Sequence, residues 1–420
     1  MKRFLVLFLL LGCSKPLQPP ATIPWMVDQW DQALHAAQAS RQPLWIEFSA
    51  PWCIYCNILD ATILTEPEIV DLAKKFVPVK IDVDKEINRQ VVQKFKEYGV
   101  PLFVTANSSG EEFSRLADPS SEGLRGLLAA TLAEGNLPEP ERKFYEGLKF
   151  QMIGEKEKAG EAYAAALPYF QSKPELATIL YFQAEEESKD EAAVQFLKTF
   201  PLHPLRPLVW KKLSELQTSE GAKWYCLQKA WKGIQEQPNS QYELIYLGMK
   251  PELASVLGIA SQRDTYREIA AEATRQAKQL HFPFLSKPYW MRAVSWNIRG
   301  GNYWRAIRLA KKLIAAYPNE FTFYELLASA YAENGEWDKA VDAQEKVVSL
   351  AHEMARPKKQ LELAGLYARQ GNFRMASTVL KTLLDSSQQG EKEKELSRRE
   401  KTAYDSAQIY LKEFETLQNL

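Results

Sequence analysis

The chain has 420 residues, which is enough for more than one domain. Its 53 lysines and arginines balance 53 aspartates and glutamates, so the formal net charge is zero and no basic surface for nucleic acid is indicated. The sequence contains four cysteines, two of them closely spaced, which excludes a small scaffold held together by disulfides.

The N-terminus has the pattern of an export signal. Two basic residues precede an apolar run at 4–11, which is too short to span a bilayer as a helix. The run ends in Leu-Leu-Gly-Cys at 10–13, which resembles the lipobox of bacterial lipoproteins. That resemblance implies a signal peptide at 1–12 and a lipid-modified Cys13. An uncleaved apolar tail with an incidental cysteine is the alternative.

The segment 13–24 contains four prolines and no apolar periodicity, which predicts a semi-extended tether. With a lipid on Cys13, the chain would be anchored to a membrane of the bacterial cell envelope and would face the periplasm. Ser14 follows the cysteine, where an aspartate is associated with retention in the inner membrane of enteric bacteria. The outer membrane is therefore slightly favoured over the inner membrane.

Between 25 and 137, segments with helical periodicity alternate with segments typical of strands. The expected order is a helix around 30–37, a strand at 44–48, a helix from the paired cysteines through 64, a helix at 67–76, a strand at 77–83, a helix at 86–98, strands at 102–106 and 112–116 joined by a turn at 107–110, and a helix at 120–134. This alternation indicates an α/β domain.

The most informative motif is Trp-Cys-Ile-Tyr-Cys at 52–56, which follows the apolar strand at 44–48. Two residues between the cysteines allow both sulfurs to lie on one helical turn and to close a small disulfide ring. Cys53 would lie at the N-terminus of a helix, where unpaired N–H groups and the helix dipole favour thiolate over thiol. We therefore expect Cys53 to be the nucleophile and Cys56 its partner in a redox-active disulfide.

Three spaced motifs carry a family resemblance, namely W-C-x-x-C at 52–56, V-P-V-K-I-D-V-D at 77–84 and G-V-P at 99–101. Together with the order of the elements, they resemble the thioredoxin superfamily, and its exported members above all. The resemblance implies a thioredoxin-like α/β domain at 25–137, with a central mixed sheet flanked by helices, and thiol–disulfide oxidoreductase activity. The sequence departs from thioredoxin between the cysteines, where isoleucine and tyrosine replace glycine and proline.

The same resemblance implies further site residues. Pro101 would be the cis-proline facing the cysteines, and the backbone of Val100 would pair with an extended substrate strand. An ordinary trans proline at the start of an edge strand is the alternative. Glu47 would be a buried acid beneath the cysteines that exchanges protons with Cys56, its pKa raised toward neutrality by desolvation. A partly exposed strand glutamate is the alternative.

Two aromatic residues border the cysteines. Trp52 would shield the thiol and border the substrate groove, a role that is compatible with simple packing. Tyr55 would contact a partner or cover the disulfide, and the sequence leaves both roles open.

Neither a second redox site nor a metal centre is predicted. Cys226 lies in an apolar helical segment, which favours a buried structural cysteine over a second redox site. The four histidines are scattered and supply no third ligand beside the paired cysteines. The sequence therefore predicts no metal and no cofactor.

From about residue 141 the strand signals stop and a helical repeat begins. The frame G-x-aromatic-x-x-A starts at Gly301, Gly335 and Gly371, so its glycines are 34 and 36 residues apart. This spacing resembles that of tetratricopeptide repeats (TPR), which are helix pairs of 34 residues. The resemblance implies an all-α TPR-like solenoid at 141–388, with the motif residues in its core and a concave face.

The repeat pattern weakens away from these three copies. A fainter copy starts at Gly154, and between 175 and 285 the pattern is degenerate, although we expect helical pairs to continue there. Dense mixed charge followed by apolar positions predicts a charged C-terminal capping helix within 389–420.

These predictions combine into a lipid-anchored, envelope-facing thiol–disulfide oxidoreductase that acts on protein cysteines and recruits a protein partner through TPR-like repeats. The direction of electron flow stays open. The alternative is a non-enzymatic envelope assembly or scaffold lipoprotein in which the thioredoxin-like domain is a binding module. The joint presence of both cysteines, a buried acid and the Val-Pro loop favours the enzyme.

Overall fold

A computed structural model describes residues 22–96, 99–117, 120–171, 176–236, 243–280, 283–390, 396 and 398–418. The predicted signal peptide at 1–12, Cys13 and all but the last residues of the predicted tether at 13–24 lie outside the described residues. In the part of the chain that is described, no helix combines the length and the apolar character needed to cross a membrane.

The N-terminal domain is built on a five-stranded mixed sheet. In spatial order its strands are β1 (Met26–Val27), β3 (Val77–Asp82), β2 (Leu44–Ser49), β4 (Leu102–Ala106) and β5 (Glu112–Leu116). β1, β3 and β2 are parallel, whereas β4 pairs antiparallel with both β2 and β5. All six residues of β2 are buried because this strand is central and covered on both faces. β1 was not predicted, because a strand of two residues is too short to show an alternation of apolar and polar side chains.

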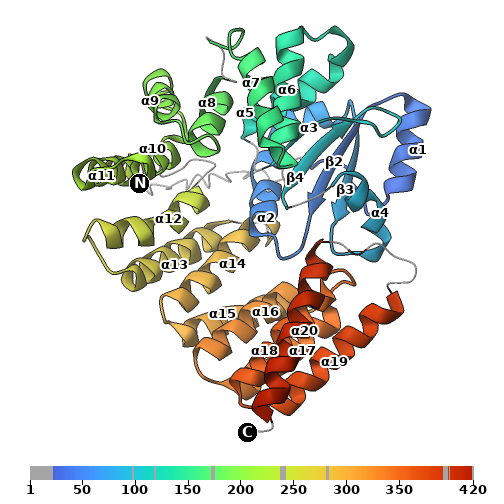
Figure 1. The fold of residues 1–420 in the computed structure, drawn as a ribbon, viewed down its shortest axis with the longest axis vertical. Coiled ribbons are helices and arrows are strands. Elements are labelled where there is room, and N and C mark those ends of the chain that lie inside the picture. Colours follow the sequence, from blue (N-terminus) through green and yellow to red (C-terminus); the bar gives the residue numbers. More distant parts are fainter. Residues whose placement is uncertain are drawn as a thin grey trace, which may run out of the picture.

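Five helices cover the two faces of this sheet (Figure 1): α1 (Trp30–Ser40), α2 (Ile54–Ala61), α3 (Pro67–Ala73), α4 (Arg89–Lys94) and α5 (Ser121–Leu132). Successive side chains of β2 point to opposite faces of the sheet. Ile46 and Phe48 pack in a core shared with α1 and α4, whereas Trp45 packs with α3 and α5. The mixed sheet flanked by helices confirms the predicted α/β fold.

Two of the predicted helices in this domain are shorter than expected. The helix predicted through residue 64 ends at Ala61, and a 3-10 turn at Ile63–Thr65 follows it. Its end coincides with Thr62, whose backbone is non-helical and whose hydroxyl donates to the Ile58 carbonyl. The helix predicted at 86–98 is a 3-10 turn at Glu86–Asn88 followed by α4, and Lys96 beyond it has a left-handed φ of 47°.

The described chain from residue 139 onward is helical throughout, which confirms the predicted all-α region. Its helices are α6 (Glu139–Met152), α7 (Lys156–Ala166), α8 (Leu176–Glu185), α9 (Asp190–Thr199), α10 (Arg206–Leu216), α11 (Glu220–Glu236), α12 (Glu243–Val256), α13 (Gln262–Gln279), α14 (Pro283–Arg299), α15 (Tyr303–Ala316), α16 (Phe321–Glu333), α17 (Trp337–Leu350), α18 (Arg356–Arg369), α19 (Phe373–Gly390) and α20 (Arg398–Gln418). Helices therefore continue through 175–285, where the repeat pattern is degenerate.

The motif glycines lie in the tight turns between paired helices. Gly301, Gly335 and Gly371 have φ values of 68°, 78° and 85°, and Gly154 has a φ of 79°. Only glycine adopts this left-handed conformation without strain, so the glycine ends one helix and lets the next fold back against it. The paired alanine of each of the three clear repeats is fully buried in the helix that follows: Ala306, Ala340 and Ala376. This arrangement is the TPR-like solenoid.

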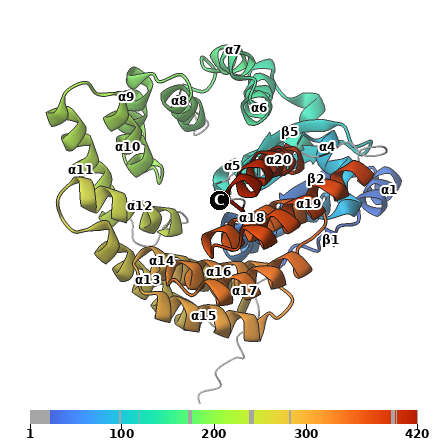
Figure 2. The same cartoon turned by 60° about the horizontal axis from the view of Figure 1, so that its bottom comes forward.

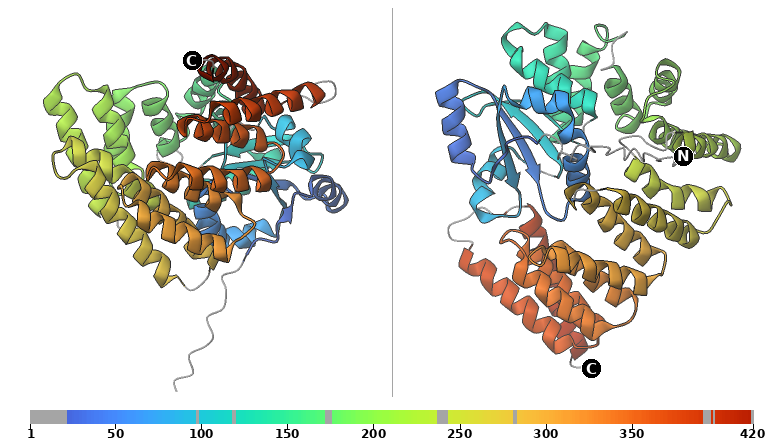
Figure 3. Two further views of the ribbon diagram at one scale, coloured as in Figure 1. Left: turned by 90° about the horizontal axis from the view of Figure 1, so that it is seen from below. Right: turned by 180° about the vertical axis from the view of Figure 1, so that it is seen from behind.

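The solenoid curves away from the α/β domain through α8 to α13 and then returns to it (Figures 1 and 2). At its start α6 packs beside β5, where the Ser114 hydroxyl donates to the Tyr145 carbonyl at 2.7 Å. Further along, α14 packs against α2. Near the C-terminus, the segment before α18 and the first turn of α20 reach the α/β domain (Figure 3), where Glu400 pairs with Arg89 at 2.7 Å. The helix predicted as a cap thus also joins the two parts of the molecule.

Candidate active site

The paired cysteines lie at the start of α2 and form a disulfide. Cys53 occupies the N-cap position, and its sulfur accepts a hydrogen bond from the Cys56 N–H at 3.0 Å. A thiolate at this position would be stabilised by that N–H and by the positive end of the helix dipole. Cys53 is only 3% exposed and Cys56 only 1%. A substrate that reaches the Cys53 sulfur therefore also contacts the side chains around it.

Glu47 is completely buried on β2, the strand that leads into α2. The parallel register of β2 and β3 sets it opposite Lys80, and their charged atoms lie 3.0 Å apart. Burial disfavours the carboxylate and raises the pKa of Glu47 from 4.5 to about 8, an effect that Lys80 opposes. Glu47 can therefore change between its protonated and its ionised form near neutral pH.

Lys80 links Glu47 to a second carboxylate. Its ammonium lies 2.7 Å from both oxygens of Asp60, which projects from α2. Burial opposes the charge of Lys80, but Glu47 and Asp60 together outweigh it and raise the pKa of Lys80. Neither Lys80 nor Asp60 was singled out from the sequence. The sequence did contain one signal that could have identified Asp60, namely its position one helical turn after Cys56.

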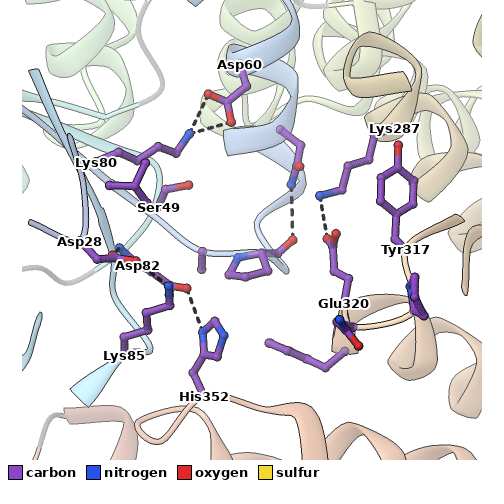
Figure 4. A pocket seen from close by; sticks show the side chains of 17 residues that line it. Asp28, Ser49, Asp60, Lys80, Asp82, Lys85, Lys287, Tyr317, Glu320 and His352 are labelled. Atoms are coloured by element: carbon purple, nitrogen blue, oxygen red, sulfur yellow. Dashed lines mark hydrogen bonds and ion pairs between the residues drawn. The ribbon is translucent and has the colours of Figure 1, made fainter. Parts of the chain in front are cut away.

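A cavity of about 580 Å³ lies between this charged group and the solenoid. Lys80 and Asp60 line one side of it, and Lys287 and Glu320 of the solenoid, paired at 2.7 Å, line another (Figure 4). Figure 4 also shows His352 pointing to Asp82, at 2.8 Å, a bond that raises the pKa of the histidine. We call this space the polar cavity. Lys80 therefore lies between the buried acid and this cavity.

Trp52 is fixed beside the cysteines by a hydrogen bond. Its indole N–H donates to a carboxylate oxygen of Asp84 at 2.5 Å, and Asp84 itself is buried just after β3. The sequence motif at 77–84 contained Asp84 but gave no reason to link it to Trp52, because the contact spans 32 residues.

Val100 and Pro101 lie where β4 begins, and the peptide bond between them is cis. Pro101 is buried, and Val100 is half-buried against the same apolar cluster that contains Cys53, Cys56 and Trp52. The structure thus brings Cys53, Cys56, Trp52 and Val100 into one cluster, whereas Tyr55 contacts Arg292 of the solenoid.

The residues between the cysteines contact the solenoid of the same chain. The Arg292 guanidinium of α14 lies 5.1 Å from the centre of the Tyr55 ring. Ile54 and Ile58 pack into the solenoid core beside α14. The surface of α2 that carries Tyr55 is therefore occupied in part by the protein itself.

The fourth cysteine, Cys226, is not part of this site. Cys226 lies in α11, forms no disulfide and is buried in the solenoid core, where burial raises the pKa of its thiol. In the described ranges, no group of three or more histidine, cysteine, aspartate or glutamate side chains is placed to hold a metal ion.

Comparison with known proteins identifies relatives of the N-terminal domain. The sequence model of the thioredoxin-like family matches residues 25–107. A thioredoxin H-type of Fagopyrum esculentum is 30% identical over 106 residues, covering 24% of this chain and 84% of that protein. The thiol:disulfide interchange protein DsbD of Campylobacter jejuni is 23% identical over 20% of this chain, and the chain spans 16% of that protein's length.

A solved structure overlaps a larger part of the chain at lower similarity. A tetratricopeptide repeat protein from Parabacteroides merdae ATCC 43184 covers 64% of this chain and 99% of its own, with 16% identity and a TM-score of 0.38. The family match and the Fagopyrum relative concern the domain that carries the paired cysteines. The chain therefore belongs to the thioredoxin-like family, and its Cys53–Cys56 pair supports thiol–disulfide oxidoreductase chemistry at the level of that superfamily.

Proposed function

We propose that this protein is a thiol–disulfide oxidoreductase of the bacterial cell envelope that acts on the cysteines of other proteins. The observation that carries the proposal is the disulfide at the N-terminus of α2, together with the completely buried, ionisable Glu47 on the strand that leads into this helix. A disulfide placed only for stability needs neither a helix N-terminus nor a buried acid with a pKa raised toward neutrality.

The exchange proceeds through a mixed disulfide. In the reducing direction the Cys53 thiolate attacks one sulfur of a substrate disulfide, and the second substrate sulfur leaves as a thiolate. Cys56 then gives up its proton and attacks the Cys53 sulfur, which releases the first substrate sulfur. Two electrons pass from the protein dithiol to the substrate, and the Cys53–Cys56 disulfide is formed. In the oxidising direction the same steps run in reverse.

Glu47 is assigned the proton transfer at Cys56. The Lys80 ammonium stabilises the Glu47 carboxylate before the transfer, and that carboxylate then accepts the proton that Cys56 loses and becomes neutral. Lys80 also leads to Asp60 and the polar cavity, so the proton has a hydrated outlet that avoids the substrate side. Glu47 therefore acts in the resolving step rather than in the first attack.

The predicted anchor and the repeats complete the proposal. A lipid on Cys13 holds the protein at a membrane facing the periplasm, with the outer membrane favoured over the inner one. The TPR-like repeats recruit a protein partner and raise its effective concentration at the cysteines. The supporting observation for recruitment is the all-helical solenoid that begins and ends against the redox domain.

The decisive experiment is a Cys56→Ala variant expressed in its native host. Without the resolving thiol, mixed disulfides should accumulate on Cys53, sediment with membranes and depend on Cys13 for that behaviour. A Cys53→Ala variant is the matched control and should carry no adducts. The adducts can be isolated under denaturing conditions and their substrates identified by mass spectrometry. No adduct in vivo, together with no disulfide reduction in vitro, would rule out the oxidoreductase.

One observation favours a second candidate, a non-enzymatic assembly or scaffold lipoprotein. Both cysteines are almost completely buried, and α14 covers the face of α2 that carries Ile54 and Ile58. A domain that only binds partners would tolerate such coverage. This candidate predicts that the Cys56→Ala variant forms no adducts and that Cys53→Ala leaves the protein fully functional in its host.

A further inference from the structure

We infer that the C-terminal half of the solenoid forms part of the substrate site, as one wall of a pocket for a large apolar side chain next to the reacting cysteine of the substrate. The other wall is Trp52 and Ile54 of the redox domain. The inference rests on the proposed thiol–disulfide exchange and extends it by naming the chemistry of the substrate segment.

The pocket is a cavity of about 550 Å³ beside the nucleophile. Trp52 and Ile54, the residues on either side of Cys53, both line it. A substrate sulfur bonded to Cys53 brings its neighbouring residues within a few ångströms, because consecutive Cα atoms are about 3.8 Å apart. The side chains next to the substrate cysteine therefore reach this cavity. We call it the apolar pocket.

The solenoid wall of the apolar pocket is mainly hydrocarbon. Its apolar side chains come from α14, α16, α18, α20 and the segment before α18, and they are Met291, Leu326, Met354, Leu361 and Ala403. Cavities of this size that are lined mostly by apolar side chains bind apolar groups and orient them through a few polar contacts. Methionine adds a side chain that adapts to different apolar shapes.

Three of the four charged groups that line the pocket already have a partner within the protein, and the fourth, Lys358, is mostly exposed. Lys359 is buried and lies 2.8 Å from Glu325, and Asp84 accepts the Trp52 indole bond. A charged substrate side chain would have to break these contacts or be buried without a partner, which is costly. An apolar side chain meets no such penalty.

One polar side chain that lines the pocket carries a buried hydroxyl without a hydrogen-bond partner in the described part of the chain. Thr322 lines the pocket and is 5% exposed, and among the described residues its hydroxyl is one of the buried side-chain groups without a hydrogen-bond partner. A hydroxyl in that state is destabilising until a partner arrives. An extended peptide carries an N–H and a C=O at every residue and can satisfy it.

The walls of the apolar pocket are fixed to each other rather than loosely apposed. The Met354 N–H donates to the Asp84 carbonyl at 2.8 Å, directly at the rim. Arg89 binds both carboxylate oxygens of Glu400 at 2.7 and 2.8 Å, which ties the start of α20 to α4. On the other side Ile54 packs in one cluster with Met291. A preformed pocket loses less entropy on binding and discriminates by shape.

The experiment measures selectivity between two symmetrical peptide disulfides. Each is a short peptide with one cysteine, joined to its own copy, with leucine or glycine on both sides of the cysteine. The reduced full-length chain, in detergent, is mixed with each disulfide, and the rate of Cys53–Cys56 oxidation is followed. We expect the leucine peptide to react about tenfold faster, the discrimination that burial of one apolar side chain supports.

Variants of the pocket test its shape. Leu361→Trp fills it, so the ratio of the leucine rate to the glycine rate should fall to about one. Leu202→Trp, at a leucine exposed between α9 and α10, is the matched control and should keep the wild-type ratio. Leu361→Ala enlarges the pocket and should favour a tryptophan peptide over the leucine peptide, which keeps the test decisive if Leu361→Trp does not fold. Thr322→Val should slow both peptides by a similar factor.

The outcomes separate this inference from the proposed function. If the wild-type chain reduces hydroxyethyl disulfide but does not distinguish the two peptides, the pocket inference is wrong and the oxidoreductase stands. An unchanged ratio in both folded Leu361 variants leads to the same conclusion. If the wild-type chain reduces neither the peptides nor hydroxyethyl disulfide, the proposed function fails and the inference fails with it.

Discussion

Two cavities lie between the redox domain and the solenoid, and they differ in chemistry although their volumes are similar, about 580 and 550 Å³. The polar cavity is lined by charged side chains, among them Lys80, Asp60 and Lys287. The apolar pocket is lined mainly by aliphatic and aromatic side chains, among them Ile54 and Leu326. The solenoid therefore does not simply cover the redox domain, because it provides a different environment on each side of the cysteines.

The active-site helix separates the two spaces. α2 contributes Ile54, next to the nucleophile, to the apolar pocket, and Asn57 and Asp60, three and six residues further along the helix, to the polar cavity. Substrate contacts and proton transfer are thus assigned to two different cavities beside one short helix. A change on one side is expected to leave the chemistry of the other side intact, and three predictions follow from that separation.

The largest effect is expected where the apolar pocket is tied together. Arg89→Met leaves the buried Glu400 carboxylate without its two bonds from Arg89, which should lower the free energy of unfolding by about 3 kcal/mol. It should also reduce the preference for the leucine peptide, because α20 carries Ala403 of the pocket wall. Urea denaturation and the peptide rates measure the two effects.

An exposed arginine provides the control for this variant. Arg142 pairs with Glu139 at the solvent-exposed start of α6, so Arg142→Met should cost less than about 1 kcal/mol. Equal destabilisation by the two substitutions would show that the Arg89–Glu400 contact does not join the two parts of the molecule.

The next effect concerns the acid beside the polar cavity. With a pKa of about 8 in the folded chain and 4.5 as its ordinary value, Glu47 keeps a proton after folding that the unfolded chain has lost. The free energy of unfolding therefore falls as pH rises through this window. Glu47→Gln removes that dependence, so the variant should gain at least about 1 kcal/mol relative to wild type between pH 5 and pH 8.

Denaturation of the oxidised protein measures this effect without interference from the cysteines. Glu122→Gln, at an exposed glutamate of α5, controls for the loss of one negative charge. If that variant shows the same trend with pH, the trend does not belong to Glu47. Resolution of the mixed disulfide should also be slower in Glu47→Gln, while the fold and the peptide preference are kept.

Much of the fold was accessible from sequence because its signals are local. The apolar strand before the cysteines, the helix after them and the glycines of the repeats each depend on a few neighbouring residues. The positions of Cys53 and Cys56 at the start of α2 follow from the same local pattern. The shortened helices were missed because single residues, such as Thr62, end them.

The contacts that complete the site were not accessible in this way. The pairing of Glu47 with Lys80 depends on the register of β2 and β3, and Arg89 meets Glu400 across 311 residues. Periodicity describes each helix pair of the solenoid but not the curvature that returns the chain to its start. Both cavities arise from that return, so they appear only in three dimensions.

The smallest of the three effects is expected for Asp60, which acts on Glu47 without touching it. Asp60 holds Lys80 at 2.7 Å with both oxygens, whereas Glu47 lies 3.0 Å from the same ammonium. Asp60 therefore draws the cation toward itself, and its own negative charge also disfavours the Glu47 carboxylate. Asp60→Asn should lower the pKa of Glu47 by about one unit, so that stability changes with pH over a narrower range.

The direction of this shift decides between two roles for Asp60. If its main role were to aim Lys80 at Glu47, the substitution would weaken that ion pair and raise the pKa of Glu47 instead. The same denaturation series at several pH values distinguishes the two signs, with Asp71→Asn, which removes an exposed pair with Lys74, as the control. Because Asp60 faces the polar cavity, its substitution should leave the ratio of peptide rates unchanged. A change in that ratio would mean that α2 does not separate substrate contacts from proton transfer.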